Sequence, residues 1–178
     1  MSSSTKLNVD SSGVVVSPTL YRSIIGSLLY LIVSRPDIAF SVGVCARYQA
    51  APKESHLTAV KQIIRYINGT PDYGLWYSKD SNACLVKYSD ADWAGSVDDR
   101  KSTSGGCFYL GNNFVLWMSK KQNFVTLSIA EAEYIAAGSC CTQLLWMKKL
   151  LHDYGIPQDT MCVFYDNTSA INLSKNPV

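Results

Sequence analysis

The stretch Cys84–Asp90, with the sequence Cys-Leu-Val-Lys-Tyr-Ser-Asp, decides the fold that we expect. Its apolar and aromatic residues are typical of a β-strand, and the strand ends in a carboxylate. Downstream, Cys107–Leu110 and Phe114–Met118 flank a Gly-Asn-Asn turn and predict a hairpin. A long helical pattern from about Ile129 to Tyr154 precedes another short strand, Met161–Tyr165. This order predicts a mixed α/β sheet, with the long helix as the crossover to a parallel strand.

Residues on either side of this core extend the prediction in both directions. Leu75–Tyr77 predicts a further short strand, and Asn167–Ser174 predicts the start of a last helix. Upstream, apolar residues recur at helical spacing in segments that begin near Pro18, Pro36 and Pro52. We therefore expect three parts: a flexible Ser-rich lead-in over residues 1–17, a small helical segment over 18–73 and the α/β domain over 74–178.

The composition excludes several classes of protein. Of the 178 residues, 47% are hydrophobic and 17% are charged, so the chain can bury a core, and bulk disorder is excluded. A net charge of +2 is too small for a polycationic binder, so any contact with nucleic acid needs a local basic patch. The most apolar run, Ile24–Val33, is far shorter than the roughly 20 residues of a membrane helix.

In the long helix, we expect core positions for Leu144, Leu145 and Trp146.

The cysteines do not indicate a metal site. Six are scattered along the chain, and none forms a Cys-x-x-Cys pair. Neither His56 nor His152 stands at ligand spacing from a cysteine, so a zinc site is not indicated. The first residues also lack the apolar stretch of a secretory signal. We therefore expect reduced, mostly buried thiols in an intracellular protein with no membrane segment.

Three carboxylates stand where a sheet-based metal site would place them. Asp90 and Asp166 each end a predicted strand, and Glu133 lies in the first turns of the long helix. Functional groups collect at strand ends in open α/β sheets, and Mg²⁺ prefers carboxylate oxygens. Two such ions about 4 Å apart can activate a water and stabilise a leaving oxygen in phosphodiester cleavage. On spacing alone, both aspartates also have a structural explanation, because Asp often ends strands and caps helices.

Two neighbouring glutamates have to be distinguished. The residues from Ser128 to Glu131 have the S-x-x-E pattern of a capping box, which gives Glu131 a structural role. Glu133 has no such role, and its helical neighbours are small or apolar, namely Ile129, Ala130, Ala136 and Ala137. A carboxylate on such a face is unfavourable unless it is paired or bound to a metal, so we favour Glu133 as the ligand.

Several motifs follow one another in a fixed order along the chain. In the second part they are Tyr88–Gly95, Asp99–Gly105, Ser119–Gln122, Ala130–Ala137 and Asp166–Ile171. In the first part they are Tyr21–Leu31, Arg35–Phe40 and Ile64–Thr70. Together they resemble copia-type retrotransposon Pol polyproteins, and plant elements in particular. The first group resembles the ribonuclease H domain, and the second group resembles the segment that connects the polymerase to that domain.

The resemblance implies both a fold and an activity. It implies a ribonuclease H-like sheet of three antiparallel strands, followed by a helix and a parallel strand beside the first. It also implies that metal-activated water cuts the RNA strand of an RNA–DNA hybrid, with Asp90, Glu133 and Asp166 as ligands of two Mg²⁺ ions. The polymerase part of the polyprotein would be a partner. The place of action would be the cytoplasm, a virus-like particle or the nucleus.

Two polar segments are candidates for contact with the nucleic acid. Basic and hydroxyl groups suit phosphate and 2′-OH contacts, which distinguish RNA by shape rather than by sequence. The alternative is that both segments are ordinary solvated turns. The candidate residues are Arg100, Lys101, Ser102, Thr103, Lys120, Lys121 and Gln122.

The chain departs from the family pattern after Asp166. The family carries a fourth acidic ligand further along the chain, whereas residues 167–178 contain no Asp or Glu. They also stop before the strand and helix that close the family's domain, so we expect a C-terminally incomplete domain in a fragment truncated at both ends. A two-metal site that lacks one ligand is weakened. The alternative to a ribonuclease is a non-catalytic remnant, acting at most as a nucleic-acid- or protein-binding fold.

Overall fold

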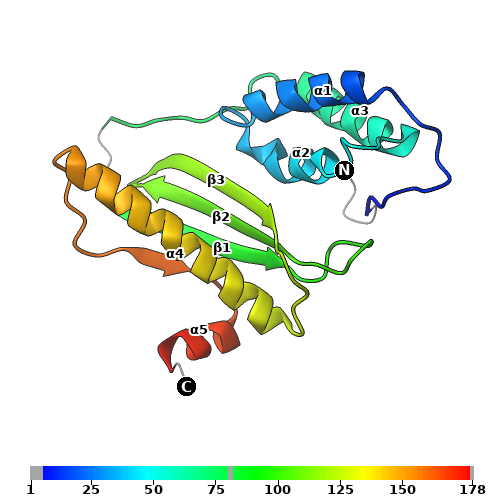
Figure 1. The fold of residues 1–178 in the computed structure, drawn as a ribbon. Helices are drawn as coiled ribbons and strands as arrows, with labels where there is room; N and C mark the ends of the chain where they lie inside the picture. Colours follow the sequence, from blue (N-terminus) through cyan, green and yellow to red (C-terminus); the bar gives the residue numbers. More distant parts are fainter. Residues whose placement is uncertain (1–5, 80–81, 177–178) are drawn as a thin grey trace. The chain divides into compact units, whose positions relative to one another are not determined.

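The protein forms two compact units, Met1–Leu75 and Trp76–Val178 (Figure 1). The structure is a computed structural model that describes residues 6–79 and 82–176. Among the described residues, the first unit is helical apart from one isolated β-bridge, and the second contains a sheet with two helices.

The helices of the first unit begin and end close to where the sequence predicts. Helix α1 spans Pro18–Leu31, and its N-cap, Ser17, accepts a hydrogen bond from the amide of Leu20. A short 3₁₀ turn, Pro36–Ile38, leads into α2, Ala39–Ala46. Helix α3 spans Glu54–Gly69.

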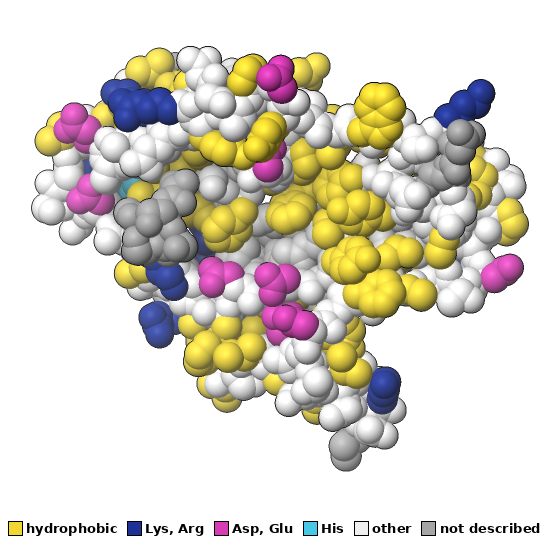
Figure 2. Space-filling model, turned by 180° about the vertical axis from the view of Figure 1, so that it is seen from behind, with side chains coloured by type: hydrophobic (Ala, Val, Ile, Leu, Met, Phe, Trp, Pro, Cys, Tyr) yellow, Lys and Arg dark blue, Asp and Glu magenta, His cyan; other side chains and the backbone are white. Residues whose placement is uncertain are grey.

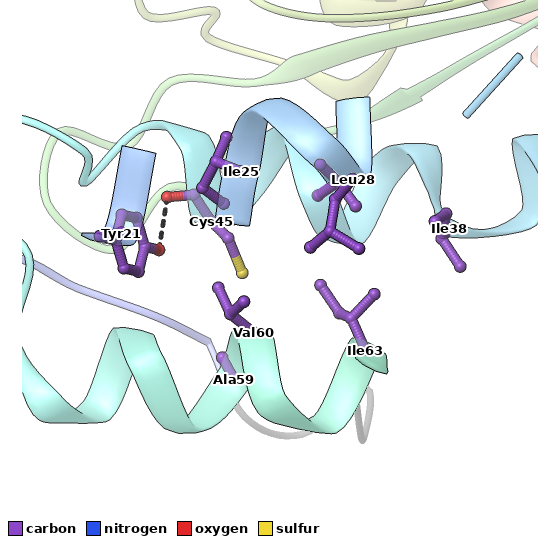
Figure 3. Packing of buried hydrophobic residues seen from close by; sticks show 9 residues of the cluster. Tyr21, Ile25, Leu28, Ile38, Cys45, Ala59, Val60 and Ile63 are labelled. Atoms are coloured by element: carbon purple, nitrogen blue, oxygen red, sulfur yellow. Dashed lines mark hydrogen bonds between the residues drawn. The ribbon is translucent and has the colours of Figure 1, made fainter. Parts of the chain in front are cut away.

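Apolar side chains from these helices form one core (Figure 3). Helix α1 contributes Ile25 and Leu28, and α3 contributes Val60 and Ile63. The Tyr21 hydroxyl, which is buried with them, donates a hydrogen bond of 2.9 Å to the carbonyl of Cys45 on α2. The buried phenol is therefore satisfied, and it also ties α1 to α2.

The described part of the N-terminal segment, residues 6–17, makes specific contacts, whereas the sequence predicted a flexible lead-in. The Tyr48 hydroxyl donates to the carbonyl of Leu7 at 3.0 Å. Nε2 of His56 lies 2.7 Å from the carbonyl oxygen of Asn8. Val15 forms an isolated β-bridge with Lys53. These long-range contacts fix the segment against the start of α3.

Arg35 joins two sequence motifs that lie far apart in the chain. Its guanidinium is 5% exposed and makes two hydrogen bonds with the Asp37 carboxylate, at 3.0 and 2.9 Å. It also donates to the carbonyl and the hydroxyl of Thr70, at 2.9 and 2.8 Å. The rings of Tyr66 and Tyr73 lie within cation–π distance. Arg35 thus fixes the end of α3 to the turn that precedes α2.

The second unit has the predicted mixed sheet. Its strand order is β3-β2-β1-β4, with β1 antiparallel to β2, β2 antiparallel to β3, and β4 parallel to β1. This is the ribonuclease H-like arrangement that the resemblance implied. The elements are β1 Leu85–Asp92, β2 Thr103–Leu110, β3 Asn113–Lys121, α4 Ile129–Asp153, β4 Cys162–Phe164 and α5 Thr168–Lys175. The predicted strand Leu75–Tyr77 does not form: these residues have no regular secondary structure.

Helix α4 lies across one face of the sheet (Figure 1). Beneath it, Leu85 and Phe108 from the sheet pack against Cys140 and Leu144 from the helix. The helix approaches closely because Gly106 has no side chain: a Cβ there would lie 2.9 Å from Cys140 Sγ. Its outer face corrects one prediction, because Leu145 and Trp146 are 62% and 59% exposed and only Leu144 is in the core.

The opposite face of the sheet carries a row of aromatic rings. Tyr88 stacks on Phe164 with a centroid distance of 5.3 Å, and it meets Tyr109 edge to face. Tyr109 in turn meets Phe114 edge to face, so the row crosses all four strands. Tyr88 and Phe164 are each 49% exposed. The view from behind shows hydrophobic side chains at the surface with acidic ones beside them (Figure 2).

The cysteines differ in part from the prediction. All six are free thiols. Cys45 and Cys140 are buried, but Cys84 and Cys141 are exposed. In residues 6–79 and 82–176, no helix has both the length and the apolar character needed to cross a membrane.

We expect Arg35→Lys to destabilise the first unit by about 1.5–3 kcal/mol, because an ammonium group cannot reproduce the planar fork that bonds both Asp37 and Thr70. Amide hydrogen exchange in α1 and α3 measures this loss. The control is Arg65→Lys, because Arg65 is exposed on α3. Equal exchange rates in the two variants would contradict the role given to Arg35.

Lys87 is a local defect in the core of the second unit. It is fully buried, its Nζ has no hydrogen-bond partner among the described residues, and it lies 5.8 Å from the centroid of Phe108. We therefore expect Lys87→Met to raise the free energy of unfolding by about 1–3 kcal/mol. Urea unfolding followed by Trp fluorescence reports on this unit, since all four Trp lie between positions 76 and 146. Exposed Lys149→Met is the control, and a lower midpoint for Lys87→Met would refute the prediction.

Candidate functional site

Sheet topology brings two of the predicted acidic residues to one edge. Because β4 runs parallel to β1, the C-terminal ends of both strands lie at the same edge of the sheet. Asp90 lies near the end of β1, and Asp166 follows β4 by two residues. Both side chains are exposed, as expected for residues that leave the sheet at its edge.

The start of α4 brings the third acidic residue to this edge. Ser128 Oγ accepts a hydrogen bond from the amide of Glu131, and Glu131 Oε2 accepts one from the amide of Leu127. The predicted capping role of Glu131 is therefore confirmed, with Leu127 as the amide that its side chain caps. The cap fixes the first turn of α4. Glu133 is only 4% exposed, which shows that its side chain points to the sheet rather than to solvent.

Asp90 and Glu133 meet at a single backbone amide. The N–H of Ala91 donates to Glu133 Oε1 at 3.0 Å and to Asp90 Oδ1 at 2.8 Å. The second oxygen of Glu133, Oε2, is buried and has no hydrogen-bond partner among the described residues. A buried carboxylate oxygen without a partner is unfavourable, so Glu133 is suited to receive a proton or a cation.

This environment raises the pKa of Glu133 from 4.5 to about 7. Removal of the carboxylate from water is the main cause, and the negative charges of Asp90 and Asp166 add to it. The Ala91 amide opposes the shift, because it stabilises the charged form.

The fit to a metal is partial. Asp90 and Glu133 supply the hard oxygen ligands that Mg²⁺ prefers, and Glu133 Oε2 is free of other bonds. Asp166 is close enough to act on the charge of Glu133. However, the described residues contain no group of three His, Cys, Asp or Glu side chains placed to hold a metal ion. Two of the three predicted ligands are therefore in contact, and Asp166 is near but not part of such a group.

The predicted nucleic-acid contacts divide into exposed and buried residues. Arg100 and Lys120 are exposed, whereas Ser102, Thr103 and Gln122 are at most 7% exposed. The buried side chains cannot reach a nucleic acid in this conformation, so we leave them out of the candidate interface. The remaining two, Lys101 and Lys121, are half-buried at about 30% exposure of their side chains.

Asp99 organises these half-buried lysines. Its carboxylate lies 2.8 Å from Lys121 Nζ and 3.8 Å from Lys101 Nζ. The hydrogen bond from Lys121, together with one from Ser96, lowers the pKa of Asp99 to about 2. Part of the local positive charge is thus neutralised, which leaves Arg100 and Lys120 as the stronger candidates for phosphate contact.

The sequence did not reveal a buried polar network behind these loops. Ser102 Oγ lies 2.9 Å from Thr126 Oγ1 and accepts a hydrogen bond of 3.1 Å from the amide of Ala94. The indole of Trp93 donates to the carbonyl of Thr126 at 3.3 Å. Thr126 has no local sequence signal, because its partners come from segments more than 20 residues away. The sequence also gave no indication of the role of Ala91, because Ala91 contributes only its backbone amide to the acidic site.

We expect Glu133→Gln to flatten the pH dependence of stability between about pH 4.5 and 7. The folded unit holds the Glu133 proton more tightly than the unfolded chain, so the free energy of unfolding falls as the pH rises through this range. The loss is on the order of 2–3 kcal/mol. Urea midpoints from Trp fluorescence between about pH 4.5 and 8 measure it. The control is Glu131→Gln on the same helix, and an unchanged profile in Glu133→Gln would show that the pKa of Glu133 is not raised.

Comparison with known proteins places the chain in a family. The Pol polyprotein of transposon RE2 from Arabidopsis thaliana is 42% identical over 100% of this chain and 12% of its own length. That of transposon TNT 1-94 from Nicotiana tabacum is 44% identical over 88% of this chain, again 12% of its own length. The secreted RxLR effector protein 161 from Plasmopara viticola is 44% identical over 71% of this chain and 90% of its own length.

No protein-family model and no solved structure matches the chain significantly. The chain covers only 12% of the length of each of these Pol polyproteins. The match to the RE2 polyprotein covers the whole chain and therefore both units. By its sequence, therefore, this chain belongs to the copia-type retrotransposon Pol polyproteins.

Proposed function

We propose that the second unit is a ribonuclease H module that hydrolyses the RNA strand of RNA–DNA hybrids with the help of Mg²⁺. The observation that carries the proposal is the buried, unpartnered Oε2 of Glu133 beside Asp90, at the edge where β1 and β4 end. A buried carboxylate beside a second, exposed one, with no counter-ion among the described side chains, favours a cation as the missing partner. The Pol relatives and the ribonuclease H-like sheet support the same conclusion.

Each of the chain's own residues has a distinct role in this proposal. Asp90 and Glu133 hold the metal, and the Ala91 amide orients both carboxylates. Asp166 completes the site from the neighbouring strand end, which requires it to move closer than it lies in this structure. Bound Mg²⁺ supplies activation of the attacking water and stabilisation of the leaving oxygen.

The exposed basic residues support a nucleic-acid substrate. Arg100 and Lys120 are exposed cations that can contact phosphates of the hybrid. Asp99 holds Lys121 and Lys101 beside them. We propose that the module acts next to the polymerase part of a Pol polyprotein, inside the cell, in the cytoplasm, a virus-like particle or the nucleus.

One observation favours a second candidate function. The described residues contain no complete three-residue metal group. A site with one weak metal position would bind hybrids without cutting them. The second candidate is therefore a non-catalytic fold that binds nucleic acid or protein.

Cleavage of a hybrid separates the two candidates. We expect the purified full chain to cut the labelled RNA strand of an RNA–DNA hybrid when Mg²⁺ is present and to lose this activity with a chelator. Asp90→Asn is expected to lower the rate by roughly a hundredfold or more, the scale on which loss of one charge-stabilising group lowers a turnover number. Asp92→Asn is the control, because the Asp92 carboxylate occupies the space above Gly95 in the next loop.

The proposed ribonuclease activity would be refuted if the wild-type chain cut the hybrid no faster than Asp90→Asn does. If that chain still binds the hybrid in a salt-dependent way, the non-catalytic function is supported. Hybrid binding that weakens in Lys120→Ala but not in Lys149→Ala would locate the contact at the end of β3.

A further inference from the structure

Gln122 connects the sheet to the helix that carries Glu133. It follows β3 directly, and it is only 7% exposed. Its Nε2 donates one hydrogen bond of 3.0 Å to Ser104 Oγ on β2 and another of 3.0 Å to the carbonyl of Ala132 on α4. Ala132 is the residue immediately before Glu133. One side-chain amide therefore bridges the sheet and the first turns of α4.

The anchor on the sheet lies opposite the acidic pair. In the β1–β2 ladder, Ser104 is the partner of Ala91, whose amide holds both Glu133 and Asp90. The contacts therefore close into a ring: Gln122 to Ser104, Ser104 across the ladder to Ala91, Ala91 to Glu133, and Ala132 back to Gln122. This ring of contacts fixes the distance between α4 and the sheet at the position of Glu133.

The two caps at the start of α4 do not set its distance from the sheet. The Ser128 cap and the Glu131 side chain bond within residues 127–131, so they define where the helix begins but not where it sits. The Ala132 carbonyl can accept the Gln122 hydrogen bond as a second one, because a carbonyl oxygen has two lone pairs. The bond to Gln122 thus adds to the helix without interrupting it.

The choice of glutamine is not explained by packing alone. Gln122 Oε1 is buried and has no hydrogen-bond partner among the described residues, which is unfavourable. An apolar side chain of similar length would fill the same space without burying that oxygen. The two donor bonds are what an apolar residue would lack.

We propose that Gln122 is a positioning residue: its side-chain amide holds α4 where the Glu133 carboxylate meets Ala91 and Asp90. Its consequence for hybrid cleavage rests on the proposed function, but the placement of Glu133 does not. Gln122 acts through Ala132 and Ser104 and touches neither substrate nor metal.

The test uses the Ala91 amide as a reporter of Glu133. In Gln122→Met, α4 keeps its apolar packing but loses the hydrogen-bonded link to Ser104, and we expect Glu133 to withdraw from the Ala91 amide. We expect hydrogen exchange at the Ala91 amide, measured by NMR without metal, to accelerate at least about tenfold, with a shift of its proton signal. Glu133→Ala is the positive control and is expected to give the same signature. If the chain cleaves hybrids, Gln122→Met is expected to lower kcat by roughly tenfold to a hundredfold with KM unchanged.

The chain offers a matched control for a buried glutamine. Gln158 is also 7% exposed, accepts a hydrogen bond from the amide of Leu85 and donates one to the carbonyl of Ala83, at the far end of β1. Gln158→Met is expected to leave exchange at Ala91 unchanged. If the two substitutions changed exchange at the Ala91 amide equally, or if Gln122→Met did not change it, Gln122 would be a packing residue and the proposal would be wrong.

A milder variant covers the case in which Gln122→Met does not fold. Ser104→Ala removes only the anchor on β2 and retains the bond from Gln122 to Ala132. We expect the same direction of change at the Ala91 amide, and wild-type exchange there would overturn the proposal. If the wild type cuts no hybrid, the proposed function fails, whereas the reporter at Ala91 still decides the role of Gln122.

Discussion

The close packing of α4 on the sheet is the constraint on which the second unit depends. The helix presents a stripe of small side chains, Ala132, Ala136, Ala137 and Cys140, to the sheet. Gly106 on β2 leaves room for this approach, because any side chain there would collide with Cys140. A closely packed helix brings Glu133 within reach of a backbone amide on β1. A larger residue on either side would lift the helix and separate the two carboxylates.

The same packing places charged groups where they are unfavourable. Lys87 and Glu133 are both buried against α4, and each keeps a polar atom without a partner among the described residues. The two differ in their surroundings. Lys87 lies beside Phe108 and Cys140 in an apolar core, where nothing in the structure calls for a charge. Glu133 lies at the sheet edge beside Asp90, where its raised pKa marks a site that lacks a positive partner.

The first unit shows how distant motifs become one structural feature. The residues around Arg35 and those around Thr70 stand apart in the sequence, yet the guanidinium joins them through hydrogen bonds to a carboxylate, a carbonyl and a hydroxyl. A planar fork of five donors can satisfy all of these at once, which lysine cannot.

The sequence by itself determined the helices, the order of the main strands, the parallel crossover and the acidic residues at the sheet edge. These follow from local signals: apolar periodicity, caps such as Ser17 and Ser128, and turns. It failed at Leu75–Tyr77, where a short apolar run found no strand to pair with, and at Trp146, where helical spacing alone could not tell the inner face from the outer one. Only the tertiary structure decided that Glu133 meets Asp90 at the Ala91 amide, that Gln122 is buried, and that Asp99 pairs with Lys121. Each of these depends on contacts between segments distant in the chain, and the position of a helix above a sheet is set by packing and hydrogen bonds between such segments, for which no local pattern exists.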